Sequence, residues 1–335
     1  MFQADASRSA YTPEPLPQAL CPSWCHRTAT PQPAWPTSER LNFDRAAQPV
    51  IADGALFFAS SGDDQVVAID AATGKVRWSR FVDAPARLAP AVWRDRVLVA
   101  SDDGFLYCLD AADGRALWTV RGGPRADMIL GNERMISRWP ARGGPVIVGD
   151  TVYFGAGIWP TEGVYLHALD AATGKRLWVN DTSGSIEMDQ PHGGARAKGG
   201  VAAQGHLAAV GNTLLVPTGR AVPAAFDRAT GEFRYFHLQA NGKVGGSGVA
   251  IIDEHFFNGG SMFAVSDGAA RATLGGTTIK GDDLGTPPDR PTVHVAAHPR
   301  WIVFGADNQV TAVDRSKPLS EGKAVDAKGK RGRAI

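Results

Sequence analysis

The chain reads AIDAATGKVRW at residues 68–78. Nearly the same stretch returns as CLDAADGRALW at residues 108–118 and as ALDAATGKRLW at residues 168–178. A fourth copy begins AFDRATG at residues 225–231 and has Tyr235 where the others have tryptophan, and a shorter fifth copy reads AVDR at residues 312–315. Close copies of one segment along a chain are the signature of a repeat architecture.

Each copy predicts a strand, a turn and a second strand. The aspartate ends an apolar run, and its short side chain can accept bonds from backbone N–H groups of a turn, while the glycine four residues later tolerates a positive φ. The large tryptophan side chain is expected to pack between neighbouring units. The repeat positions with these structural roles are Asp70, Gly74, Trp78, Asp110, Gly114, Trp118, Asp170, Gly174, Trp178, Asp227 and Gly231.

Strand-like apolar runs precede the copies and extend the series to six units. They occupy residues 55–59, 96–100, 151–155, 213–217, 255–257 and 301–305. Asp70 and Asp110 are 40 residues apart, which is about the length of one four-stranded propeller blade, and the longer later spacings indicate loop insertions. We therefore predict an all-β fold, a β-propeller with six recognisable repeats and about six to eight blades when complete. A β-sandwich or barrel would explain short strands but not the repeated unit.

The composition limits the classes of partner. The 335 residues include 35 Lys and Arg against 34 Asp and Glu, for a net charge of +1, so no basic footprint for nucleic acid is present. The apolar runs are of strand length, far short of the roughly 20 residues that span a bilayer. Residues 1–20 contain no basic start followed by an apolar stretch, so either the protein is cytoplasmic or its export signal is missing from this sequence.

Three segments are expected. Residues 1–48 are rich in Pro, Ser and Thr, a composition that predicts an extended arm, and residues 41–43 are expected to add a strand that closes the ring. Residues 49–315 are expected to form the propeller. Residues 316–335 are expected to form a disordered basic tail. The sixth repeat stops before its second hairpin strand, which leaves a bare sheet edge, so we expect a fragment of a longer protein. A monomer is expected.

The pattern Ala-x-Asp-x-x-Thr-Gly-x-x-x-Trp, complete at residues 68–78 and 168–178, resembles the tryptophan-docking repeat of the pyrroloquinoline quinone (PQQ) type propellers. The chain is also similar to uncharacterised bacterial propellers with PQQ-like repeats and to the propeller of an outer-membrane assembly lipoprotein that binds no cofactor. This resemblance implies the fold and export to the periplasm or outside the cell.

The dehydrogenase branch of this superfamily would imply two adjacent cysteines beside the quinone, a tryptophan platform, and Glu, Asn and Asp ligands for calcium. The cysteines are Cys21, Cys25 and Cys108, and none is adjacent to another. We therefore expect no cofactor, with PQQ and calcium as the alternative.

Candidate ligand-binding residues lie in the insertions, because a rigid scaffold usually displays function on its loops. Arg138, Trp139, Trp159 and Arg220 offer cations and aromatic faces for a carboxylate, a sugar or a quinone, but packing at blade junctions explains the tryptophans equally well. Asp189 and His192 lie three residues apart and could bind metal or act as an acid and a base. We favour a solvated loop at that position.

Two further groups have both a structural and a chemical interpretation. Asp102 and Asp103 precede Gly104; a turn is the simpler interpretation and a calcium site the weaker one. Cys21 and Cys25, followed by His26, resemble a haem c attachment site with one residue too many between the cysteines, so a disulfide or two free thiols is favoured. Cys108 takes the alanine position of its repeat and is expected to be buried.

The sequence contains no nucleophile elbow, phosphate-binding loop or zinc-protease motif. We therefore expect a non-catalytic propeller that acts as a binding or scaffold module for a protein or a polysaccharide in the cell envelope. The alternative is a PQQ-dependent alcohol or sugar dehydrogenase.

Overall fold

The computed structural model describes residues 1–38, 41, 43–190, 194–219, 221–238, 246–259, 261–273, 294–306, 309–315, 324–325 and 331–332. Regular structure in these residues is almost entirely β-strand, together with one short 3-10 helix, η1 (Pro160–Glu162). Within the described part of the chain, no helix is both long and apolar enough to span a bilayer. The all-β prediction is confirmed.

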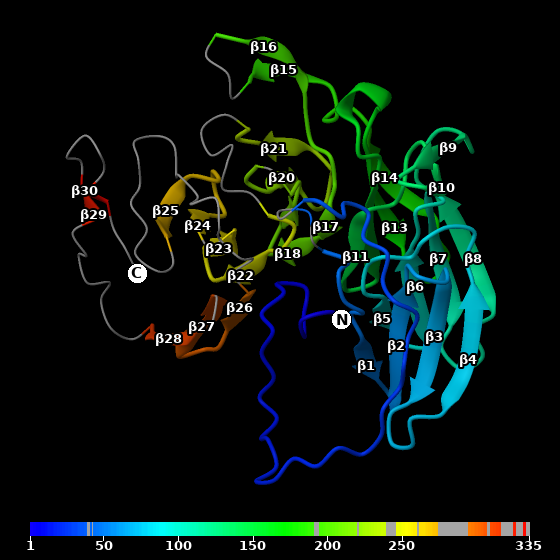
Figure 1. The fold of residues 1–335 in the computed structure, drawn as a ribbon. Helices are drawn as coiled ribbons and strands as arrows, with labels where there is room; N and C mark the ends of the chain where they lie inside the picture. Colours follow the sequence, from blue (N-terminus) through cyan, green and yellow to red (C-terminus); the bar gives the residue numbers. More distant parts are fainter. Residues whose placement is uncertain are drawn as a thin grey trace.

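In the described part of the chain, six mainly antiparallel sheets follow one another and form six blades (Figure 1). The first three blades contain β1 (Val50–Ala52), β2 (Ala55–Ser60), β3 (Gln65–Asp70) and β4 (Val76–Phe81); β5 (Ala91–Trp93), β6 (Arg96–Ala100), β7 (Phe105–Asp110) and β8 (Ala116–Arg121); and β11 (Gly143–Val148), β12 (Thr151–Ala156), β13 (Tyr165–Asp170) and β14 (Arg176–Asn180). The last three contain β18 (Ala208–Val210), β19 (Thr213–Val216), β20 (Ala224–Asp227) and β21 (Phe233–Tyr235); β22 (Ala250–Ile252), β23 (His255–Asn258), β24 (Ser261–Ala264) and β25 (Ala270–Thr273); and β26 (His294–Ala297), β27 (Trp301–Ala306) and β28 (Gln309–Asp314).

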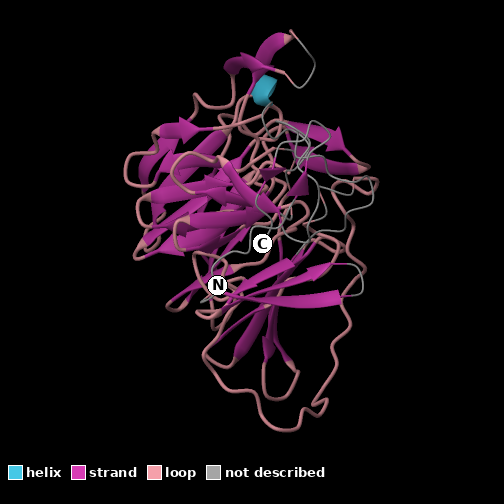
Figure 2. Cartoon of the chain, turned by 90° about the vertical axis from the view of Figure 1, so that its left-hand side faces the viewer, coloured by secondary structure: helices cyan, strands magenta, loops and turns pink. Residues whose placement is uncertain are grey.

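The insertions form small additions to this framework. Two hairpins project from it, one of β9 (Met128–Gly131) with β10 (Arg134–Ser137) and one of β15 (Ile186–Asp189) with β16 (Arg196–Gly199). In the third blade, β17 (Gly205–His206) pairs in parallel with β11. Figure 2 shows η1 next to the β15–β16 hairpin. In the predicted disordered tail, most residues lie outside the described part of the chain, and β29 (Ala324–Val325) pairs with β30 (Arg331–Gly332).

The first strand of each blade lies toward the centre of the molecule and the last strand toward its periphery. Successive first strands, from β1 through β5, β11, β18 and β22 to β26, contact one another around this centre. The ring of blades is open between the first and the sixth blade, and the N-terminal chain runs through the opening (Figure 1). The sixth blade has three strands among the described residues.

The repeated aspartate and glycine build the turn that the sequence predicts. Asp70 Oδ1 accepts bonds from Thr73 N and Thr73 Oγ1 at 2.9 and 2.8 Å, and Gly74 has a φ of +72°. Because an L-residue with a side chain is disfavoured at such a φ, the glycine is required there. Asp110, Asp170 and Asp227 likewise accept backbone N–H bonds, and their glycines also have positive φ.

The aromatic residue of each repeat contacts the turn of the next blade. Trp78 Nε1 donates to the carbonyl of Ala111 at 2.9 Å, and a Cβ on Gly114 would lie 2.6 Å from the Trp78 ring. The rings of Trp118 and Trp178 lie in the same way against Gly174 and Gly231. In the fourth blade Tyr235 takes this place: its hydroxyl donates to Val265 O at 2.8 Å, and its ring lies against Gly268.

The arm supplies the equivalent aromatic side chain for the first blade. Trp24 Nε1 donates to Ala71 O at 2.9 Å, and a Cβ on Gly74 would lie 2.6 Å from the Trp24 ring. The strand predicted at residues 41–43 does not form at the described residues Leu41 and Phe43. Phe43 is instead buried in a small apolar cluster with Ala34 and Leu88.

Candidate functional site

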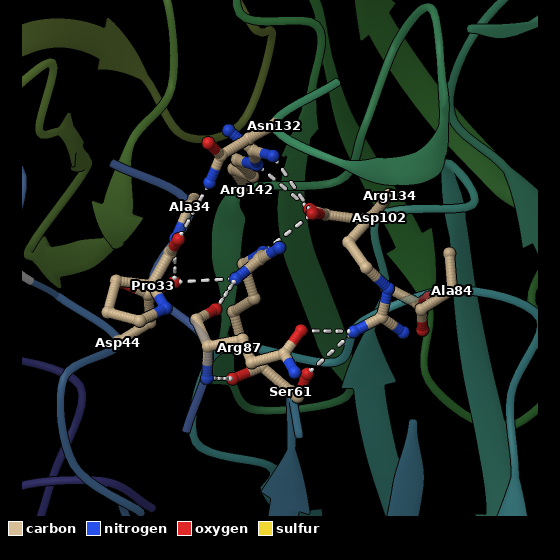
Figure 3. A network of polar contacts seen from close by, with 12 residues as sticks. Pro33, Ala34, Asp44, Ser61, Ala84, Arg87, Asp102, Asn132, Arg134 and Arg142 are labelled. Carbon is tan, nitrogen blue, oxygen red and sulfur yellow. Dashed lines mark hydrogen bonds and ion pairs between the residues drawn. The ribbon is translucent and has the colours of Figure 1, made fainter. Parts of the chain in front are cut away.

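The candidate site lies at the end of the blades where the arm crosses the molecule. Loops β2–β3, β4–β5 and β6–β7 all open toward this end, because alternate connections of antiparallel strands lie at the same end of a sheet. Residues 28–38, 41 and 43–48 of the arm run over these loops, and polar side chains from both meet there (Figure 3).

Asp102 accepts hydrogen bonds from two arginines in the interior of this region (Figure 3). Arg87 Nε lies 2.6 Å from Asp102 Oδ2, while Arg142 Nε lies 2.8 Å from Oδ1 and one terminal nitrogen of Arg142 lies 2.9 Å from Oδ2. The three side chains are only 1–3% exposed. Charge-assisted bonds of this kind are short and directional, so they fix the β4–β5, β6–β7 and β10–β11 connections against one another.

Asp44 joins the arm to the same group. Its Oδ2 accepts from Arg87 at 2.9 Å and from the backbone N–H of Ala34 at 2.7 Å. With Asp102 and Arg142 this makes a buried set of two carboxylates and two guanidinium groups, whose formal charges cancel. We call it the buried ion network. The other oxygen of Asp44, Oδ1, is buried without a hydrogen-bond partner.

Burial and charge act in opposite directions on the buried ion network. Burial by itself would raise the pKa of Asp102, but Arg142 and Arg87 outweigh it and hold the pKa below its usual value. Burial would lower the pKa of Arg87, but Asp102 and Asp44 raise it. Asp102 and Arg87 therefore stay charged at neutral pH, and the network holds the arm against the blades.

Aromatic and polar groups of the arm complete this end. The Arg142 guanidinium lies 5.7 Å from the centre of the Trp35 ring, and Trp35 Nε1 donates to Gln204 Oε1 at 2.8 Å. Further along, a groove of about 240 Å³ lies between the arm and the first blade, and Phe58, Val67 and His26 line it.

Polar side chains of the β9–β10 hairpin bind the arm. Asn132 Nδ2 donates to Pro33 O at 3.0 Å, and Arg134 donates to Gln32 Oε1 at 2.7 Å and forms an ion pair with Asp64. These contacts fix the orientation of a two-stranded hairpin that would otherwise be only marginally stable.

The opposite face of this hairpin is apolar and exposed. Met128, Leu130 and Met135 are 42, 74 and 55% exposed, and Met135 lies directly across from Leu130 in the strand pairing. The alternate residue Ile136 is 1% exposed and turns toward the protein. This face is not predictable from the sequence, because the run Met128-Ile129-Leu130 is apolar at every position and does not reveal which side is buried.

Three of the predicted ligand-binding residues meet around η1. Arg138 forms an ion pair with Glu162 at 3.5 Å, and Trp139 Nε1 donates to Glu162 O at 2.7 Å. Trp139 is 3% exposed, whereas Trp159 is half-buried and directly precedes η1. Trp139 therefore packs inside the protein and only Arg138 and Trp159 reach its surface.

The other predicted residues lie elsewhere. Asp189 is exposed on the β15–β16 hairpin and pairs with Arg196 at 3.1 Å. His192 and Arg220 lie outside the described residues. Asp103 is buried and accepts bonds from the Tyr107 hydroxyl and Phe105 N, and burial raises its pKa.

The cysteines separate into two kinds. Cys21 and Cys25 are exposed free thiols on the arm. Cys108 is buried, as its alanine-like repeat position predicted, and burial raises the pKa of its thiol to about 12.

The residues at this end do not fit calcium and a quinone. Calcium takes several oxygen ligands, but both oxygens of Asp102 accept from arginines, and Asp44 is bound to Arg87. Among the described residues, no group of three or more His, Cys, Asp or Glu side chains is placed to hold a metal ion. The two buried arginines that could bind the acid groups of a quinone already bind carboxylates of this chain.

Comparison with known proteins gives one family and several partial relatives. A family model described as outer membrane protein assembly factor BamB matches residues 28–317. The dehydrogenase subunit of a quinone-dependent alcohol dehydrogenase from Komagataeibacter europaeus is 30% identical over 172 residues, which are 48% of this chain and 22% of that protein. Quinohemoprotein alcohol dehydrogenase ADH IIB from Pseudomonas putida is 32% identical over 146 residues, 39% of this chain and 19% of that protein.

The chain thus spans about a fifth of the length of these curated relatives. Among solved structures, BamB from Moraxella catarrhalis superposes with a TM-score of 0.50 at 17% identity, over 80% of this chain and 73% of that one. This likeness concerns the fold.

Proposed function

This chain belongs to the BamB-type family of PQQ-repeat propellers, and we propose that it acts as a non-catalytic scaffold that binds a protein partner in the cell envelope. The periplasm or the outside of the cell is the proposed location, in keeping with the family description, an outer membrane protein assembly factor.

The exposed face of the β9–β10 hairpin carries this proposal. Met128, Leu130 and Met135 project from a hairpin that is tied to the arm on its other side, so the apolar face is presented on a fixed support. Methionine is flexible and polarizable and is common on protein-binding surfaces. An apolar face of this kind suits the aliphatic side chains of a polypeptide better than the hydroxyl groups of a polysaccharide.

The fixed charges of Asp102 and Arg87 in the buried ion network also favour a scaffold over an enzyme. Catalytic groups are usually poised to gain or lose a proton near the working pH. Asp102 has a lowered pKa and forms ion pairs with Arg87 and Arg142 in the interior. These groups therefore suit a structural role, in which they hold neighbouring loops rigidly together.

Site-specific photo-crosslinking tests the proposal. A photo-reactive residue at position 130 is expected to crosslink one defined polypeptide in envelope preparations, and Leu130→Asp is expected to weaken binding of that purified polypeptide at least tenfold. Removing one buried leucine contact costs roughly 1.5–3 kcal/mol, and each 1.4 kcal/mol is about tenfold in affinity.

The matched control is Leu177→Asp, because Leu177 is also exposed, at 54%, but lies on the peripheral strand β14. It should leave the affinity unchanged. If Leu130→Asp binds the partner as tightly as the unmodified protein, or if the crosslinked species is a polysaccharide, the hairpin face is not a protein-binding surface.

The second candidate function is a PQQ-dependent dehydrogenase, and the observation that favours it is the resemblance to quinone-dependent alcohol dehydrogenases. Titration calorimetry with PQQ, with and without calcium, separates the two functions. Saturable, calcium-dependent binding would replace the scaffold proposal, whereas folded protein that binds no PQQ would support it.

A further inference from the structure

The first ten residues lie in the middle of the open ring, beside the inner strands of the last three blades (Figure 1). Among the described residues, strands β18, β22 and β26 each pair with a neighbouring strand on one side only, so backbone groups on their other edges are free to bind another segment.

Three blades in succession bind the backbone of this segment. Ala209 N donates to Ala6 O at 2.8 Å, Ile251 N donates to Ser7 O at 2.8 Å, and Ala297 N donates to Ser9 O at 2.6 Å. We call the three donors, together with the carbonyls of Pro145 and Leu207, the inner-edge site. Backbone bonds of this type give affinity without depending on the side chains of the bound segment.

One side chain supplies specificity. The Arg8 side chain is among the most deeply buried in the molecule: the residue is 1% exposed. Its Nε donates to Leu207 O, and one terminal nitrogen donates to Pro145 O, both at 2.9 Å. The other terminal nitrogen donates to Phe2 O at 2.9 Å. The planar guanidinium thus meets three carbonyl oxygens, an arrangement that the point-like ammonium of lysine cannot reproduce.

Neighbouring groups suit a cation of this shape. The Phe2 ring stacks on His206 with 4.1 Å between ring centres, and His206 Nε2 accepts a bond from Ala89 N, so this nitrogen carries no proton. Burial and the nearby Arg8 lower the pKa of His206 well below its usual value. A neutral His206 therefore adds no repulsion to the buried guanidinium.

The backbone conformation of residues 1–10 is unfavourable by itself. Gln3, Ala4, Arg8 and Ala10 have positive φ values of 53, 74, 59 and 53°. Residues other than glycine disfavour this region of backbone conformation. Contacts with the blades must therefore hold the segment in place, and a peptide without this strain would compete with it.

We propose that the inner-edge site binds a short, turn-containing peptide that presents one arginine, and that residues 5–10 of this chain occupy it as an internal ligand. The ligand in trans is a short arginine-bearing segment of a partner protein. This site is separate from the face of the β9–β10 hairpin, so either proposal can fail without the other.

Cleavage of the folded protein tests the exchange. A protease site is inserted at Leu16, which is 80% exposed in the arm, and the full chain is folded before it is cut. The freed N-terminal piece should remain bound during gel filtration and should exchange with a labelled peptide of sequence MFQADASRSA.

Peptide variants then test the chemistry. The Arg8→Ala peptide should compete at least tenfold less well and the Arg8→Lys peptide should fall between the two, whereas Gln3→Ala should compete like the original sequence. Because glycine accepts a positive φ, Ala4→Gly should compete several-fold better. Failure of the labelled peptide to exchange, or equal competition by Arg8→Ala, would overturn the proposal.

Discussion

Replacing Asp102 by asparagine removes the carboxylate that two buried arginines share. The substitution keeps the side-chain shape but leaves Arg87 and Arg142 with one buried carboxylate, Asp44, between them. Breaking a buried ion pair by removing one partner costs about 3–5 kcal/mol, because an uncompensated charge remains in the interior. With side chains that are 1–3% exposed, solvent relieves little of this cost.

Urea unfolding followed by tryptophan fluorescence measures the loss. Asp102→Asn is expected to lower the free energy of unfolding by about 3–5 kcal/mol and the melting temperature by on the order of 5–10 °C. The control is Asp127→Asn, because Asp127 pairs with Arg125 at 2.7 Å on the surface, where side-chain exposures are 38 and 64%. Such surface pairs contribute about 1 kcal/mol or less.

The direction in which the stability of the protein changes with pH follows from the lowered pKa of Asp102. Because Asp102 has a lowered pKa in the folded state, its stabilising contribution is present above the unfolded pKa of about 3.9 and is lost as the pH falls through the lower folded value. Asp102→Asn should reduce this loss of stability at acidic pH. A variant that unfolds within 1 kcal/mol of the unmodified protein at pH 7 would refute the proposed role of the network.

Trp24→Ala removes the indole and its hydrogen bond to the first blade, so the arm should be cleaved about tenfold faster by protease in limited digestion, which corresponds to about 1.4 kcal/mol. An unchanged cleavage rate would mean that this contact does not hold the arm. His167 is buried, and burial lowers its pKa to about 4. The unfolded chain takes up a proton below about pH 6.5, so acidification from pH 7 to 5 should cost about 2 kcal/mol at this residue. His167→Phe should reduce that loss in urea unfolding, and an identical pH dependence in the variant would contradict the assignment. Thiol titration should find Cys21 and Cys25 reactive in the folded protein and Cys108 only after unfolding. Three fast thiols would show that Cys108 is accessible.

Local patterns were sufficient to predict the repeats. The Asp70 turn and the positive φ of Gly74 depend on residues within a few positions of each other, so their spacing is visible in the sequence. The six strand runs were likewise identified from apolar stretches between turns. The expected packing of tryptophan against a neighbouring blade agrees with the contact of Trp78 with Gly114.

The sites were much harder to predict. Asp102 was interpreted as a turn residue with a weak calcium alternative, but its partners Arg87 and Arg142 lie 15 and 40 positions away in the chain. Arg138, Trp139 and Trp159 were chosen individually for their chemistry, and their meeting at η1 depends on how an insertion folds back.

By itself, the sequence determined the repeat, the turn chemistry and the all-β class, because each rests on the conformational preferences of neighbouring residues. Only the tertiary structure decided which polar groups are buried together, that Trp24 contacts the first blade, and that Arg8 lies among carbonyls of distant strands. Burial and pairing depend on residues brought together from far along the chain, and these separations leave no periodic signal in the sequence.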